Sequence, residues 1–409
     1  MGDLYVDATA PPGGNGSKRH PYNIIGKAVT AAPARTTIHV AEGQYREDLK
    51  TVFVKPGVWL KGSTVLCLGD RGLPTGETHQ AAIVKPPTAG IPKGEAIFRI
   101  QAENVAITGL VIDGKADVVE QQGSLVIVDG AQGRVDGFRI KGNVLVNAGT
   151  AVLARLAAGT IRRNYIGLLS IGVHVFGLSS KSRKRVLFEN NRVEKNFVVG
   201  ALFNGAVGSR RAPTFEAREG RLRVTVRGNY FVGNGGKPSD YPSNNPSTGL
   251  HFLLNDNTQS DPLQGARIDA LVRENTFIDN VWYGVVVGQR IEPDKRLIGY
   301  SFEGTFERNR YRGNGLRAAA FCFRHIVVSH GAGSQHFRYG RGSTIAIHAT
   351  GDPLARMDFD YDHPAVDCDP HDYMDPPGHE DAGPPLLNTL TLNDKLVPTH
   401  ITLGPPRIG

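Results

Sequence analysis

Two histidines, His174 and His251, each stand two residues after a glycine that opens a short apolar segment. An imidazole changes charge near neutral pH, so it can take up or release a proton during a reaction. Arg155 and Asn204 can neutralise a carboxylate, and Tyr283 can protonate a departing oxygen. These are the groups that β-elimination from a uronic acid needs: a charge neutraliser, a base for the C5 proton and a proton donor. We therefore expect His174, His251, Arg155 and Tyr283 to be catalytic.

Further polar and aromatic side chains follow the same segments and are expected to bind the substrate: Asn204, Trp282, Asp256, Arg290 and Tyr241. Two other interpretations stay open. The histidines can be ordinary surface residues, and the aromatic side chains can pack turns. Glycoside hydrolysis is a second chemistry, but it needs two facing carboxyl groups. Only loop residues, Asp256, Asp269 and Glu216, could supply them.

A short motif that ends in asparagine recurs along the middle of the chain and indicates how these residues are positioned. Its copies are Phe138–Asn143, Thr160–Asn164, Leu187–Asn191, Val224–Asn229, Leu271–Asn275 and Gly304–Asn309. In four copies a second asparagine follows five residues later, at Asn196, Asn234, Asn280 and Asn314. The motif is nearly constant while the intervals vary, which is typical of a solenoid with one coil per repeat and insertions in the turns.

Period-two alternation on short segments, with Asn or Gly at the corners, predicts strands and tight turns. When such strands stack in parallel, the asparagines at one corner can hydrogen-bond to each other and satisfy buried amides. Alternation also assigns the faces of the strands after each glycine. Val173, Val175, Leu250 and Phe252 point inward, while His174 and His251 fall on one exterior strip, roughly 10 Å apart at ~4.8 Å per strand step.

The repeats resemble those of the right-handed parallel β-helix proteins of the pectin-lyase-like superfamily. The opening of the chain adds to the resemblance, with Leu4–Ala8, a Gly/Asn turn at 13–16, an Ala-rich helix at 24–32 and strands near Thr37–Val40 and Gly43–Glu47. The resemblance covers about residues 3–330. It implies that the helix caps the N-terminal end of the solenoid. It does not fix a reaction, because this fold carries lyases, hydrolases, epimerases, esterases and non-catalytic fibres.

Signatures of the polygalacturonases, pectin methylesterases and calcium-dependent pectate lyases are absent from the sequence. Asp369-Pro370-His371-Asp372 matches a motif of the mannuronan C5-epimerases, although it lies beyond the last clear repeat. The alternative interpretation is an acidic, extended tail or loop that packs along the solenoid. A third interpretation is a loose, oxygen-rich calcium site, which Asp367, Asp369, His371, Asp375 and His379 could form. Otherwise no metal and no cofactor is expected.

The charge of the chain is +8, with 47 Lys and Arg against 39 Asp and Glu. Basic clusters at 181–185, at 210–211 and at Arg218, Arg221 and Arg223 would attract an anionic polysaccharide or oligosaccharide, the expected partner. A nucleic-acid partner is not expected, because no recognition module is present. A membrane partner is not expected either, since the apolar runs are too short. No signal peptide is visible, so the protein is expected to be either cytoplasmic or the mature form of a secreted protein.

We therefore predict an all-β chain: a right-handed parallel β-helix with a short N-terminal capping helix and an irregular C-terminal extension. The cap and first strands occupy residues 1–50, the β-helix 51–330, and the last coils with the Pro/Asp-rich extension 331–409. The predicted function is a lyase, or a related C5-epimerase, that acts on a uronate-containing polysaccharide. The alternatives are a glycoside hydrolase and a non-catalytic glycan-binding or structural β-helix.

Overall fold

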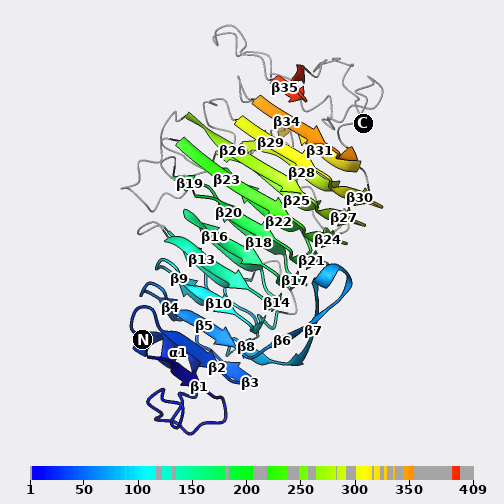
Figure 1. Ribbon diagram of the computed structural model, residues 1–409. Helices are drawn as coiled ribbons and strands as arrows, with labels where there is room; N and C mark the ends of the chain where they lie inside the picture. The colour runs from blue at the N-terminus through cyan, green and yellow to red at the C-terminus, as the bar shows by residue number, and fades with distance from the viewer. Residues whose placement is uncertain are drawn as a thin grey trace.

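A computed structural model shows the chain as a stack of coils built from three long sheets (Figure 1). It describes residues 2–87, 89–116, 122–130, 135–179, 184–205, 219–236, 248–256, 264–281, 283–291, 301–315, 317–322, 327–328, 335–336, 344–353 and 389–396. Apart from the short strand β19 and the terminal strand β36, the strands of these three sheets pair in parallel.

Each coil contributes about one strand to each sheet, and the sheets are named A, B and C here. Sheet A contains β1 (Leu4–Val6), β2 (Thr37–Val40), β5 (Trp59–Gly62), β10 (Ala106–Thr108), β13 (Val135–Lys141), β16 (Ala157–Arg162), β20 (Val186–Glu189), β23 (Glu219–Arg227), β26 (Gln264–Arg273), β29 (Ser301–Glu307), β34 (Thr344–Thr350), β35 (Thr389–Leu392) and β36 (Lys395–Leu396), with β19 (Leu178–Ser179) beside β23. Sheet B contains β3 (Gly43–Arg46), β8 (Ala82–Lys85), β11 (Val111–Asp113), β14 (Val144–Val146), β17 (Tyr165–Gly167), β21 (Arg192–Glu194), β24 (Tyr230–Val232), β27 (Thr276–Ile278) and β30 (Arg310–Arg312). Sheet C contains β4 (Thr51–Phe53), β9 (Ala96–Ile100), β12 (Ser124–Asp129), β15 (Thr150–Arg155), β18 (Ile171–Phe176), β22 (Val199–Asn204), β25 (Thr248–Asp256), β28 (Tyr283–Ile291) and β31 (Arg317–Cys322).

This arrangement is a right-handed parallel β-helix, as the sequence predicts. Figure 1 shows β1 at one end of the stack and β34 and β35 at the other. Two further short pairs lie outside the three sheets, β6 (Val65–Leu68) with β7 (Pro74–Gln80) and β32 (Val327–Val328) with β33 (Gln335–His336). The last described strands of the stack belong to sheet A, where β34 pairs with β29 and β35 with β34.

Inward side chains of successive coils form one continuous apolar core. The inward positions predicted for sheet C, including Val173, Val175, Leu250 and Phe252, are fully buried. Because neighbouring strands are ~4.8 Å apart, equivalent aromatic rings stack along the core. The rings of Phe231 and Phe277 lie 4.9 Å apart and nearly parallel. Burial of this column stabilises each coil only when the next coil is present.

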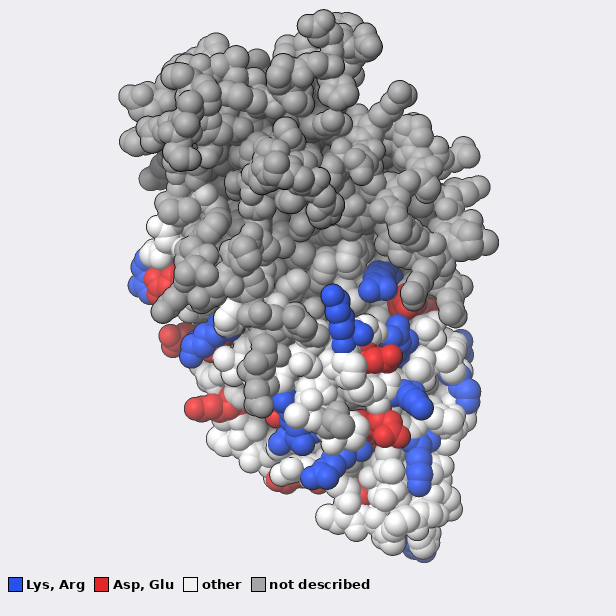
Figure 2. All heavy atoms as spheres, turned by 180° about the vertical axis from the view of Figure 1, so that it is seen from behind, with Lys and Arg blue, Asp and Glu red and all other residues white. Residues whose placement is uncertain are grey.

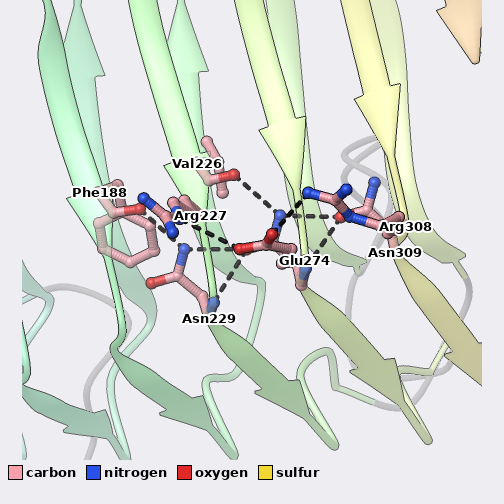
Figure 3. Close-up of polar contacts among 8 residues, drawn as sticks. Phe188, Val226, Arg227, Asn229, Glu274, Arg308 and Asn309 are labelled. Atoms are coloured by element: carbon pink, nitrogen blue, oxygen red, sulfur yellow. Dashed lines mark hydrogen bonds and ion pairs between the residues drawn. The ribbon is translucent and has the colours of Figure 1, made fainter. Parts of the chain in front are cut away.

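The predicted asparagine ladder is confirmed at the corner between sheets A and B (Figure 3). The Asn229 side chain donates from Nδ2 to the Phe188 carbonyl oxygen at 2.8 Å and to Asn275 Oδ1 at 3.0 Å. The Asn229 backbone N–H donates to the same Oδ1, and Asn275 repeats the pattern toward Asn309. Six asparagines share this geometry: Asn143, Asn164, Asn191, Asn229, Asn275 and Asn309. Asp352 ends the ladder by accepting both donors of Asn309 at Oδ2.

The second set of asparagines forms a parallel ladder after sheet B. Asn196, Asn234 and Asn280 each donate from Nδ2 to the next Oδ1 at 2.8–2.9 Å, and the row ends at Asn314. Both ladders satisfy corner amides that would otherwise be buried without partners, at a cost of several kcal/mol each. Because these corners are fixed, the segments whose length varies from coil to coil lie elsewhere in the coils.

The capping helix α1 spans Ile25–Ala31 and buries Ile25, Ala28 and Val29 against the first coils. Glu47 fixes the start of this helix, because its carboxylate accepts the backbone N–H groups of Ile25 and Gly26 at 2.6 and 2.8 Å. The Glu47 side chain is buried. This burial outweighs the two hydrogen bonds and raises its pKa from the usual 4.5 to about 7.

The β6–β7 hairpin is a feature that the sequence did not predict. It lies along sheet B beside β17 in Figure 1, where Gly76 rests against the ring of Tyr165. A Cβ at Gly76 would come within 2.9 Å of that ring, and its φ of +92° also favours glycine. Arg71, at the tip of the hairpin, donates from Nη1 to Thr276 Oγ1 at 2.7 Å. The hairpin thus connects the first coils to coils about 200 residues later in the chain.

The Asp369-Pro370-His371-Asp372 motif and the proposed calcium ligands around it lie outside the described residues. Within the part of the chain that is described, no group of three or more His, Cys, Asp or Glu side chains is arranged to hold a metal ion. No helix in that part is long and apolar enough to cross a membrane.

Removal of one amide from the middle of the first ladder tests its contribution to stability. Asn229→Ala deprives the buried Asn191 N–H and Nδ2 of their acceptor. We expect a loss of roughly 2–5 kcal/mol in the free energy of unfolding, measured by chemical denaturation. Asn314→Ala, at the partly buried end of the second ladder, should cost clearly less. If the two variants lost equal free energy of unfolding, burial of the ladder amides would not be the main source of their contribution to stability.

Glu47 gives a pH-dependent prediction for the N-terminal cap. Because its folded pKa is raised, its contribution to stability is complete below pH 4.5 and is lost as the pH rises toward 7. The loss is on the order of 3 kcal/mol. In Glu47→Gln this group does not titrate, so the Tm of the wild type relative to this variant should fall between pH 4.5 and 8. A Tm difference that stays constant over this interval would show that burial does not raise the Glu47 pKa.

Candidate functional site

The candidate site lies on the outer face of sheet C, where strand register lines up side chains from successive coils. Leu153, His174, Leu202, His251 and Val286 are direct partners on adjacent strands β15, β18, β22, β25 and β28. The alignment predicted from alternation is therefore present, and it brings His174 and His251 into one column. The column is not the exposed strip that we expected, because Leu202, His251 and Val286 are buried. Two strand steps separate them, which corresponds to roughly 10 Å between their backbones.

Both imidazoles are neutral. Burial lowers the pKa of His251 to about 3, and its side chain is only 5% exposed. Burial, followed by the positive charge of Arg155 and then by His251, lowers the pKa of His174 to about 3 as well. The His174 residue is partly exposed, but its Nε2 atom is enclosed and has no hydrogen-bond partner in the part of the chain that the structure describes. The expectation that these histidines titrate near neutral pH is therefore wrong for the free protein.

Arg155 lies in the neighbouring outer column, in register with Phe176. Its guanidinium carbon is 5.9 Å from the centre of the Phe176 ring, and that ring lies 4.0 Å from the ring of His174. Among the described residues, Arg155 has no ion pair with a carboxylate. A cation held against an aromatic ring without an acidic partner is suited to receive an external carboxylate.

Asn204 and Asp129 complete this column. Asn204 follows Phe176 in register and is only 2% exposed. Asp129 precedes Arg155 in register and forms an ion pair with Arg99 at 3.2 Å. Our sequence analysis missed this outward carboxylate. The signal was present, since Asp129 closes the alternating segment Ser124–Asp129 in the same way that Arg155 closes the next.

The structure does not bring Tyr283 next to the histidines. Tyr283 opens β28 and pairs in register with Thr248, whose Oγ1 donates to the Tyr283 carbonyl oxygen at 2.8 Å. It stands three residues before Val286, which corresponds to roughly 10 Å along the strand from the histidine column. The side chain is mostly buried, at 8% exposure.

The remaining predicted residues are only partly described. Trp282 and Tyr241 lie outside the described residues. Asp256 and Arg290 belong to the C-terminal ends of β25 and β28, and Arg290 is in register with Asn255. Their side chains are outside the described part of the structure, so their role in binding stays a prediction.

Part of the basic clusters is engaged within the fold. Lys184 pairs with Asp136 at 3.0 Å, and Arg223 lies 3.5 Å from Asp269. Residues 181–183, 210–211 and Arg218 lie outside the described residues. On the face opposite to the view of Figure 1, basic and acidic side chains are interspersed over the described surface (Figure 2). The described part of this face therefore shows no single broad positive patch.

The influence of Arg155 on His174 can be measured separately from burial. In Arg155→Gln the pKa of His174 should rise, because one positive neighbour is removed, while that of His251 should not change. Imidazole NMR shifts followed from pH 7 to 3 would report both values. An equal shift of both histidines, or of neither, would contradict the charge coupling described here.

Comparison with solved structures finds proteins of similar architecture at low sequence identity. Pectate lyase Pel9A is 13% identical, with a TM-score of 0.48, and the match covers 85% of this chain and 75% of that one. The A-module of the Azotobacter vinelandii mannuronan C-5 epimerase AlgE6 is 14% identical, with a TM-score of 0.43 and coverage of 79% and 80%. A rhamnogalacturonan lyase is 13% identical, with a TM-score of 0.40 and coverage of 85% and 82%. A search of curated protein sequences gives no match.

The parallel β-helix fold that the resemblance implied is shown by the three long parallel sheets of the chain itself. A sequence family described as "Protein of unknown function (DUF1565)" matches residues 12–229. Because this match spans more than half of the chain, the protein belongs to the DUF1565 family.

Proposed function

We propose that this protein acts on an acidic, uronate-containing polysaccharide and cleaves it by β-elimination. The observation that carries the proposal is the outer face of sheet C. There, two neutral imidazoles share a column beside a guanidinium that has no carboxylate partner among the described residues.

In this proposal, Arg155 binds the carboxylate of one uronate residue. Withdrawal of charge from that carboxylate makes the C5 proton more acidic. We assign the base to His174 rather than His251, because the charge of Arg155 affects the pKa of His174 and not that of His251. The bound carboxylate would counter that charge and raise the His174 pKa toward the working range of a base.

In the proposed step, His174 removes the C5 proton, the C4–C5 double bond forms and the C4–O bond breaks. The imidazolium then returns its proton to the departing oxygen on the same face of the sugar. We assign this second role to His174 rather than Tyr283, because Tyr283 opens its strand away from the column. His251 and Asn204 would hold the neighbouring sugar residue. A C5-epimerase would share the first step and differ in how C5 is reprotonated.

One observation favours a second candidate, a glycan-binding protein without turnover. An imidazole whose pKa is about 3 is a weak base at neutral pH, but it both donates and accepts hydrogen bonds with sugar hydroxyls. Under this alternative the same column binds the polysaccharide and no bond breaks.

Incubation with alginate, pectate and glycosaminoglycans, followed by the ultraviolet absorbance of unsaturated uronates, tests the proposal. We expect His174→Ala to lower kcat/KM by about 100-fold or more, the usual contribution of a general base. Arg155→Gln should act mainly through KM when the carboxylate contact is lost. His348→Ala is the matched control, because His348 lies on the outer face of sheet A.

Three outcomes decide between the candidates. New absorbance that depends on His174 supports the lyase. Altered uronate stereochemistry in the NMR spectrum without new absorbance would assign the epimerase. Binding that is lost in the His174→Ala, His251→Ala double variant, with no change in any substrate, would replace the enzyme with the glycan-binding function.

A further inference from the structure

A second cluster of polar groups lies at the N-terminal end of sheet A, on a different sheet of the solenoid from the candidate site. A cavity of about 430 Å³ opens there, lined among others by Tyr5, Lys18, His39, Lys61 and Ser63. This volume falls in the range of small-ligand pockets, roughly 300–1,000 Å³.

Among the described residues, Ser63 Oγ in this cavity is buried without a hydrogen-bond partner, and His39 Nε2 has only an ion-pair contact. His39 Nε2 lies 3.3 Å from Asp3 Oδ2, but it makes no hydrogen bond to it. The ring of His39 stacks on Tyr5 with 5.0 Å between ring centres and 15° between planes, which fixes its orientation. Buried polar atoms usually have partners, so Ser63 Oγ beside the oriented His39 ring is a position suited to a ligand hydroxyl group.

A row of cations continues from this cavity along the outer face of sheet A. Lys61, Thr108, Lys141 and Arg162 are direct partners on adjacent strands β5, β10, β13 and β16. Among the described residues, Lys61, Lys141 and Arg162 have no ion pair, and the buried Nε of Arg162 has no hydrogen-bond partner. We call these three residues the cation row.

Cations farther along the same sheet are arranged differently. Arg227 and Arg308 both pair with Glu274, at 3.1 and 2.7 Å (Figure 3). Their charges are therefore already balanced by the protein. The cation row differs because its charges remain available to a ligand, and strand stacking spaces them at multiples of ~4.8 Å.

An aromatic surface lies beside the row. Trp59 is two residues before Lys61 on the same face of β5 and is 45% exposed. Arg139 reaches across the small Ala106 and places its guanidinium 5.8 Å from the Trp59 ring centre. An exposed indole next to cations can pack against the apolar face of a sugar ring while its acidic substituent meets the cations.

We propose that this surface binds an acidic oligosaccharide that lies along the solenoid axis. Its carboxylates would pair with the cation row, in which Lys61 and Lys141 stand two strand steps apart and Lys141 and Arg162 one step apart, at ~4.8 Å per step. Its terminal hydroxyl groups would satisfy His39 Nε2 and Ser63 Oγ in the cavity. This site goes beyond the function proposed for sheet C, because it requires binding and no turnover.

The proposal can be tested by isothermal titration of the full chain with a galacturonate hexasaccharide. We expect the Lys61→Gln, Lys141→Gln double variant to weaken binding at least about tenfold, since two charge-assisted contacts are lost. Trp59→Ala should weaken binding as well. The matched control is the Arg227→Gln, Arg308→Gln double variant, which removes the same charge from the last residue of β23 and from the corner that follows β29. Its affinity should change less than about twofold, as expected for cations already paired in the protein.

The His174→Ala, His251→Ala double variant separates this site from the candidate site, because binding at the cation row should persist in it. Failure of the lyase proposal would leave this result unaffected. An affinity unchanged in the lysine double variant would overturn the inference, as would a wild-type protein that does not bind the hexasaccharide. Tighter binding of single-stranded DNA of equal charge, with the same sensitivity to the two lysines, would assign the surface to nucleic acid instead.

Discussion

The structure depends on one interaction that repeats at every coil, the hydrogen bond from one buried asparagine amide to the next. Each corner turns the chain from sheet A to sheet B and leaves backbone groups without a partner in their own coil. The amide accepts from the preceding coil and donates both to a carbonyl and to the following amide. A buried polar group without a partner is costly. Every coil must therefore place its corner asparagine directly in line with the asparagines of the coils before and after it.

Fixed corners have a direct consequence for the outer surface. When all strands share one register, residues far apart in the chain form straight columns on each sheet. His174 and His251 share a column although the loops between their strands vary in length. The same rule produces the cation row on sheet A. Chemistry on this fold therefore depends on which residue occupies a given register position.

The fold and the columns could be predicted because they follow from short, local patterns. The asparagine corners and the period-two alternation identify strands, faces and neighbours before any coordinates are known. The electrostatics could not be predicted, since the low pKa of His251 results from burial by the folded chain. The contact from Arg71 to Thr276 joins residues about 200 positions apart and has no sequence signal. Asp129 lay within reach of the same alternation and was overlooked.

The first ladder also has a direction. Each amide donates one hydrogen bond back to a carbonyl of the preceding coil, but the hydrogen bonds between ladder members all run toward the C-terminal end, from Leu110 N–H to Asp352. A carboxylate accepts hydrogen bonds and has no proton to pass on. Among the described residues, the series therefore ends in a side chain that only accepts hydrogen bonds. Continuing the row of amide-to-amide hydrogen bonds past this position would require an amide in place of the Asp352 carboxylate.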